Sequence, residues 1–259
     1  YLLSKEKTAL AGAILGISLW IKLPGILAAP AIVFFLPNWR QRLNFLLTAG
    51  IVGISTYLPA LFSDPAVIFK NVFGYEGRIV ATTEWTFIWG PQIFIVPFFD
   101  SLTLQQQIRF DSLVLFVLNR GAWLAIGLIL IFSWIRRSKR TTQQLGTTIA
   151  TAYIILYGFS NSWSFQYLAW SIPFWFFAPV LFSSAATVLT SIYIYSLYWL
   201  LCGNPFLLGK WDFLGHPHWP GFIEIFRNIA WLFFFFSALV FLITGLYSEA
   251  ARIYNQKKQ

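Results

Sequence analysis

Long apolar runs separated by short polar segments dominate the pattern along the chain. A membrane-spanning helix needs about 20 apolar residues. Four runs of roughly this length each predict one span, at about 43–62, 112–134, 144–159 and 228–247. Two further runs, 9–36 and 168–202, are too long for a single helix.

Proline and charge divide the two overlong runs. Lys22–Leu23–Pro24 interrupts the first, and Pro173 and Pro179 lie in the second. Proline ends or kinks a helix, and a charge in mid-bilayer is costly. We therefore expect helices at about 9–21 and 24–36, and two short helices within 168–202. The pattern predicts an all-α, polytopic transmembrane bundle of about eight membrane segments, several of them short or broken.

Two polar segments separate the predicted spans. Residues 63–111 mix glycine, charge and aromatics, and residues 64–73 within them suggest an amphipathic helix in the interface. The second segment, 203–226, holds several charged residues and both histidines. Because repeats and low-complexity linkers are lacking, we treat residues 1–259 as a single transmembrane domain.

The basic residues lie at the ends of the apolar runs. Starting with Lys5 in the cytoplasm and alternating sides, the loop 38–42, the cluster 136–140 and the tail from Arg252 fall on that same side. That side then holds 11 of the 18 basic residues, and the opposite side holds seven of the nine acidic ones. This agrees with the positive-inside rule only if 9–36 and 168–202 each cross twice. The loops 63–111 and 203–226 are then outside.

Composition supports a lipid environment. Hydrophobic residues make up 58% of the chain and charged residues only 10%, whereas a soluble domain carries about 25% charged residues. The net charge of +9 could suggest nucleic acid, but no basic groove with stacking aromatics is visible. We therefore expect membrane lipids and not nucleic acid as partners. The expected location is the cell membrane, or the endoplasmic reticulum membrane in a eukaryote.

Two cations stand within apolar surroundings. Lys22 is the only charge in the 28 residues from Thr8 to Phe35. It could snorkel at a helix end or bind a lipid phosphate. Arg120 stands about two turns into its predicted span. Helix carbonyls or a carboxylate could satisfy it, or it could contact a phosphate or sugar.

Further candidates lie in the outer loop and at a membrane entry. Tyr75, Arg78, Glu84 and Trp85 combine carboxylate, guanidinium and rings, as a sugar-phosphate site does. A solvated loop with interfacial aromatics is the alternative. In Phe165–Gln166–Tyr167–Leu168, Gln166 and Tyr167 could contact a lipid or sugar headgroup, or merely cap a helix in an aromatic belt.

The sequence indicates no metal or cofactor. His216 and His218 stand two apart without a cluster of further ligands, and the single Cys202 allows neither an internal disulfide nor a zinc pattern. A phosphate-binding glycine loop and a serine or cysteine nucleophile motif are also lacking.

Three segments together resemble the GT-C superfamily of polytopic membrane glycosyltransferases. They are Gly12–Ala13–Ile14–Leu15–Gly16 continuing through Ile21–Lys22–Leu23–Pro24 to Ala29–Pro30, the loop from Tyr75 to Trp85, and Phe165–Gln166–Tyr167–Leu168–Ala169–Trp170 with Pro173. The lysine-then-proline pattern is similar to that of mannosyltransferases using polyprenyl-phosphate sugars. The order and spacing of the segments fit that family and cover most of the chain.

The resemblance implies transfer of a hexosyl, in particular mannosyl, unit from a polyprenyl-phosphate donor to a lipid, glycan or protein acceptor on the outer face. An acidic residue would act as base on the acceptor hydroxyl, and cations would steady the leaving phosphate. In this family that acid lies in the first outer loop. This chain begins at Tyr1 without methionine, so we expect an N-terminal part carrying the base to be missing.

Two other classes stay open. A transporter or lipid-handling protein without catalysis also uses broken helices and buried charge, and an internal inverted repeat would favour it. The third possibility is a structural subunit of a membrane complex.

Overall fold

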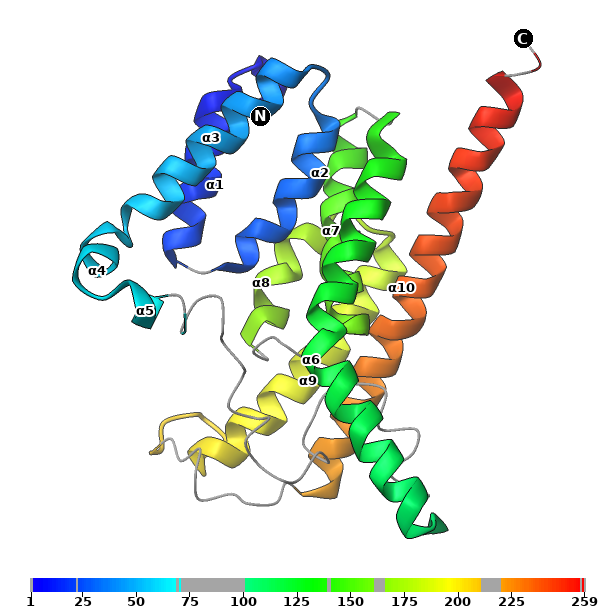
Figure 1. The fold of residues 1–259 in the computed structure, drawn as a ribbon. Coiled ribbons are helices and arrows are strands. Elements are labelled where there is room, and N and C mark those ends of the chain that lie inside the picture. Colours follow the sequence, from blue (N-terminus) through cyan, green and yellow to red (C-terminus); the bar gives the residue numbers. More distant parts are fainter. Residues whose placement is uncertain are drawn as a thin grey trace. The chain divides into compact units, whose positions relative to one another are not determined.

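The computed structural model describes residues 2–21, 23–68, 70, 101–138, 141–160, 166–210, 220–256 and 258. Every regular element in these residues is a helix, which confirms the all-α prediction (Figure 1). Three stretches are long and apolar enough to cross a membrane: Arg120–Ser138, Val180–Cys202 and Gly221–Arg252. Many of their large apolar side chains are exposed, among them Ile131, Leu181 and Ile243. Such a surface indicates a membrane protein.

The first overlong run folds as two helices, as predicted. Helix α1 (Thr8–Ile21) ends just before Lys22, and a 3-10 helix, η2 (Leu23–Leu27), leads into α2 (Ala28–Phe35). Both helices are apolar but shorter than a full span. The interruption expected at Lys22–Leu23–Pro24 is therefore confirmed.

The predicted span 43–62 is wrong in its bounds. Helix α3 (Trp39–Ser55) begins earlier because Asn38 caps it, accepting a hydrogen bond from the Gln41 backbone N–H (2.9 Å). The chain breaks after Ser55, and a short α4 (Leu58–Ser63) starts with proline in its first turn. Of the expected interfacial helix 64–73, the structure describes α5 (Pro65–Ile68), while residues 69 and 71–73 lie outside the described part.

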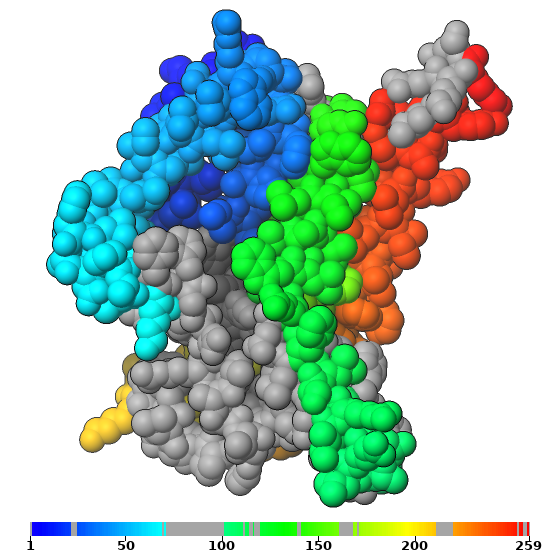
Figure 2. Space-filling view, viewed as in Figure 1, coloured from blue at the N-terminus to red at the C-terminus, as the bar shows by residue number. Residues whose placement is uncertain are grey.

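The remaining helices are α6 (Leu104–Ile135), α7 (Thr142–Phe159), α8 (Gln166–Trp175), α9 (Val180–Cys202) and α10 (Gly221–Gln256), with a 3-10 turn η8 (Arg136–Ser138) after α6. The side chains of α6 stand along the face seen in Figure 2. Both α6 and α10 extend past their predicted spans into segments read as outer loop or tail. A helix can continue beyond its apolar stretch, because its backbone hydrogen bonds do not depend on lipid.

The run 168–202 divides as expected, although not into two short helices. Helix α8 has 10 residues, but α9 has 23 and is long enough to span. The break falls at Phe176–Pro179, whereas Pro173 stays inside α8. The Ser183 hydroxyl donates to the carbonyl of Trp175 and ties α9 to the end of α8.

The residues sort into two compact units. Unit 1 comprises Tyr1–Glu76, Leu128–Ala152 and Leu242–Gln259, and unit 2 comprises Gly77–Gly127 and Tyr153–Phe241. Each unit has its own way of packing helices.

In unit 1, α1 packs directly against the backbone of α3. Gly12 faces Phe45 and Ala49, and Gly16 faces Ala49 and Gly53. A Cβ on Gly16 would stand 2.8 Å from the Ala49 carbonyl oxygen, so only glycine permits this approach. Because the contacting residues rise together in number, α1 and α3 run parallel, and α2, which follows α1 in the chain, lies beside the pair (Figure 1).

In unit 2, aromatic rings of α7, α8, α9 and α10 interlock. Phe234 is fully buried, with its ring centroid 5.1 Å from that of Tyr157 and 5.8 Å from that of Trp175. Phe182 of α9 stacks on Phe233 of α10, with centroids 5.2 Å apart. These rings form the core that holds α8 and α10 in place.

Candidate functional site

The break between α1 and α2 is held from both sides. The Trp20 indole N–H, two residues before Lys22, donates to the Val52 carbonyl of α3 (2.6 Å). On the other side, Gly25 lies so close to Ser18 that an added Cβ would stand 2.5 Å from its hydroxyl oxygen. The residues before and after Lys22 are therefore held against α3 and against the last turns of α1. Lys22 itself lies outside the described residues.

The surroundings of this break are apolar and open. Ile21, immediately before Lys22, is 73% exposed, and Trp20 and Ile26 are also exposed. Exposed apolar side chains such as Ile21 and Ile26 are typical of the depth at which lipid tails meet headgroups. Both predictions for Lys22, snorkelling and phosphate binding, need this depth.

Gln166 is the first residue of α8. The helix it starts is firmly seated: Leu168, Ser171 and Trp175 are buried, and the Ser171 hydroxyl donates to the Leu168 carbonyl (2.7 Å). The Phe174 ring also stacks on Tyr153, with centroids 5.1 Å apart. The backbone at Gln166 thus has a rigid support, while the side chains of Gln166 and Tyr167 lie outside the described part.

Arg120 lies within α6 and is exposed. The helix continues before Arg120 to Leu104, through the apolar residues 113–118, so the place of Arg120 about two turns into its predicted span stays a prediction. The other proposed sugar contacts, Tyr75, Arg78, Glu84 and Trp85, lie outside the described residues.

The described residues bring no metal site together. They contain no group of three or more His, Cys, Asp or Glu side chains. His216 and His218 are outside the described part. Cys202 is buried, and its sulfur accepts a hydrogen bond from the Gly209 backbone N–H (2.9 Å), which fixes the turn after α9.

Sequence reasoning missed a buried arginine at the start of α10. Arg227 is only 3% exposed, and its guanidinium donates to the Asn228 side-chain oxygen (2.9 and 3.0 Å). Buried Tyr193 of α9 is close enough to interact with it electrostatically. The sequence did contain a signal for this residue. Arg227 directly precedes a long apolar run, and a cation in such a helix is a functional candidate.

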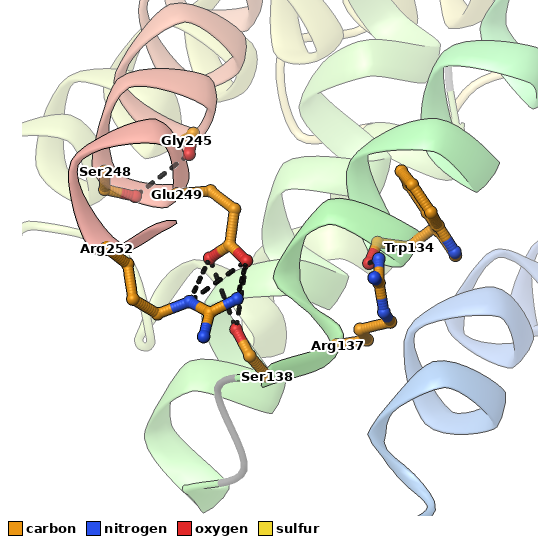
Figure 3. Close-up of polar contacts among 7 residues, drawn as sticks. All are labelled: Trp134, Arg137, Ser138, Gly245, Ser248, Glu249 and Arg252. Carbon is orange, nitrogen blue, oxygen red and sulfur yellow. Dashed lines mark hydrogen bonds and ion pairs between the residues drawn. The ribbon is translucent and has the colours of Figure 1, made fainter. Parts of the chain in front are cut away.

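A polar cluster in unit 1 was also missed (Figure 3). Glu249 of α10 accepts hydrogen bonds from the Ser138 hydroxyl (3.2 Å) and from the Arg252 guanidinium (3.1 Å). Arg136, in the same turn as Ser138, donates to the Thr148 hydroxyl of α7 (3.1 Å). This cluster joins the ends of α6 and α10, and the turn η8 also packs against α2.

The two halves of the predicted site fall in different units, with Lys22 in unit 1 and Gln166 in unit 2. That both meet one donor therefore stays a prediction. Compared with known proteins, the chain matches no family model, no curated protein and no solved structure.

Proposed function

We propose that this chain is a membrane glycosyltransferase that moves a hexosyl unit, with mannosyl the first candidate, from a polyprenyl-phosphate donor to an acceptor on the non-cytoplasmic face. The observation that carries the proposal is the anchored break between α1 and α2. Trp20 and Gly25, on either side of Lys22 in the sequence, are held against α3 and α1 there. A cation in that position is suited to the phosphate of a membrane-bound donor.

The helix directions in unit 1 support the eight-segment topology behind this proposal. Parallel α1 and α3 need the chain to return between them, and α2 is the element that does so, which supports two crossings by 9–36. Ser138, in the turn with Arg136 and Arg137, meets Glu249, three residues before Arg252 at the start of the tail. The turn η8 also contacts α2, the helix that precedes the loop 38–42. The basic segments then share the cytoplasmic side, and the Lys22 break faces the other side.

Only a few side chains take part in the proposed reaction. An acidic residue removes the proton of the acceptor hydroxyl, which attacks the anomeric carbon of the donor sugar. The bond to the lipid phosphate breaks, and cations such as Lys22 and Arg78 stabilise the phosphate that leaves. Glu84, Tyr75 and Trp85 would bind the sugar, and Gln166 with Tyr167 would contact the donor headgroup. No cofactor is required by this scheme.

The test is Lys22→Met, which keeps much of the length and the apolar stem but removes the charge. If Lys22 holds the donor phosphate, binding of a radiolabelled polyprenyl-phosphate mannose should fall at least about tenfold, because a hydrogen bond to a charged group is lost. Protein abundance in the membrane should not change. Lys5→Met is the matched control, since Lys5 is exposed at the opposite end of α1.

Unchanged donor affinity in Lys22→Met would remove Lys22 from the site. The alanine variants of Arg78 and Glu84 then test the loop separately, with transfer as the readout. A protein that binds and moves the lipid-linked sugar across the bilayer without transferring it would favour the alternative, a transporter or lipid-handling protein. Broken helices serve that class as well.

A further inference from the structure

An exposed arginine and tryptophan form a pair at the end of α6. The Arg137 guanidinium carbon stands 4.1 Å from the centroid of the Trp134 ring, within cation–π range. Its Nη1 also donates to the Trp134 carbonyl oxygen (3.0 Å). Figure 3 shows the two side chains together, directed away from the Glu249 cluster. The ring and the carbonyl hold the guanidinium in one place while leaving it open.

The nearby Arg252 differs from Arg137 in its partner. The Arg252 guanidinium is engaged by the Glu249 carboxylate, which neutralises its charge. Arg137 faces a ring and a carbonyl, and among the residues that the structure describes it has no carboxylate partner. Of these two arginines, Arg137 therefore offers the unneutralised charge.

The position of Trp134 and Arg137 along α6 and the chemistry of their side chains together indicate which ligand they bind. Trp134 and Arg137 lie at the end of the apolar stretch Arg120–Ser138, and tryptophan favours the headgroup level of a bilayer. A guanidinium presents a planar fork of donors that matches phosphate oxygens. We propose that Trp134 and Arg137 form a binding site for the phosphate of an anionic glycerophospholipid in the leaflet in which α6 ends. This site is separate from the sugar-donor site of the proposed function and does not depend on it.

The experiment measures binding of short-chain phosphatidylglycerol to the detergent-purified chain, with phosphatidylcholine of the same chain length as the zwitterionic comparison. Arg137→Gln should weaken phosphatidylglycerol binding about tenfold, as expected for a lost charged hydrogen bond. Trp134→Leu should weaken it less, because the charge remains. Lys258→Gln is the matched control: it also removes one cation above a ring (4.5 Å from Tyr254) and should change binding less than about twofold.

Two results would overturn the proposal. Equal losses in Arg137→Gln and Lys258→Gln would mean that only overall charge attracts the lipid. Inorganic phosphate that displaces phosphatidylglycerol at equal concentration would show a simple anion site with no lipid recognition. Because Arg137 is exposed, its variant should elute as the parent does in size-exclusion chromatography, so weaker binding can be assigned to the site.

Discussion

The α1–α3 pair and the aromatic core of unit 2 hold apolar helices together in opposite ways. Between lipid-facing helices, apolar side chains gain little by leaving lipid, so association depends on close packing and on polar contacts. In the α1–α3 pair, Gly12 and Gly16 have no side chains, so the two helix backbones come close together. The core of unit 2 fills the same kind of space with rings, centred on Phe234.

This difference determines how each region can fail. At the glycine contact there is no space for additional atoms, because a Cβ on Gly16 would already stand 2.8 Å from its neighbours. In the aromatic core, removing atoms leaves a cavity that rigid rings cannot refill. Overpacking should therefore damage the first region, and truncation the second.

The largest effect should come from truncating the aromatic core. Phe234→Ala removes a fully buried ring and should cost about 3–5 kcal/mol, as for other buried aromatic residues. Thermal unfolding in detergent, followed with a thiol dye that reacts with buried Cys202, measures it. Phe236→Ala is the matched control, because Phe236 lies on the same helix and is 55% exposed. Equal destabilisation by the two variants would refute the core assigned here.

An intermediate effect is expected at the glycine contact. Gly16→Leu places a side chain against the α3 backbone and should destabilise by about 1–3 kcal/mol, the usual range for overpacking. Gly50→Leu is its control, since a Cβ there would meet nothing within 4 Å. Both variants can be compared by the fraction that stays monodisperse after heating. A stable Gly16→Leu protein would mean that α1 and α3 are not packed as described.

The smallest effect should come from the polar contact that joins α6 and α10. Ser138→Ala removes the hydroxyl that donates to Glu249, and interhelical hydrogen bonds in membranes average about 0.6 kcal/mol. Ser112→Ala is the comparison, because the Ser112 hydroxyl donates to the Ile108 carbonyl of its own helix. The shift in melting temperature between the two variants isolates the interhelical bond. If Ser138→Ala lost as much stability as Phe234→Ala, polar contacts and not packing would be the main source of stability.

Local sequence signals predicted the breaks, because each depends on one or two residues. The interruption at Lys22–Leu23–Pro24 and the division near Pro179 both appear in the structure. Helix ends were predicted less well. Leu104 and Gly221 begin helices within segments read as loops, since apolar length does not limit a helix.

Pairings between distant residues could not be predicted. Ser138 and Glu249 are 111 residues apart, and no local pattern links them. The spacing of Gly12 and Gly16 was visible, but its partner helix was not. For the candidate site, α1 ends just before Lys22 and α8 begins at Gln166, while the roles of these two residues stay predictions. Buried Arg227 was overlooked because it falls between the predicted loop 203–226 and the predicted span 228–247.

The shortness of α1 has a consequence for the surrounding bilayer. Its 14 residues rise only about 21 Å, whereas the hydrocarbon layer is about 30 Å thick. A crossing made by α1 therefore leaves a mismatch of about 9 Å, which lipids meet by thinning locally. Thinning beside Ile21 would draw headgroups and water down toward Lys22. The depth of the lysine would then depend on membrane thickness, and lipids with longer tails would bury its charge.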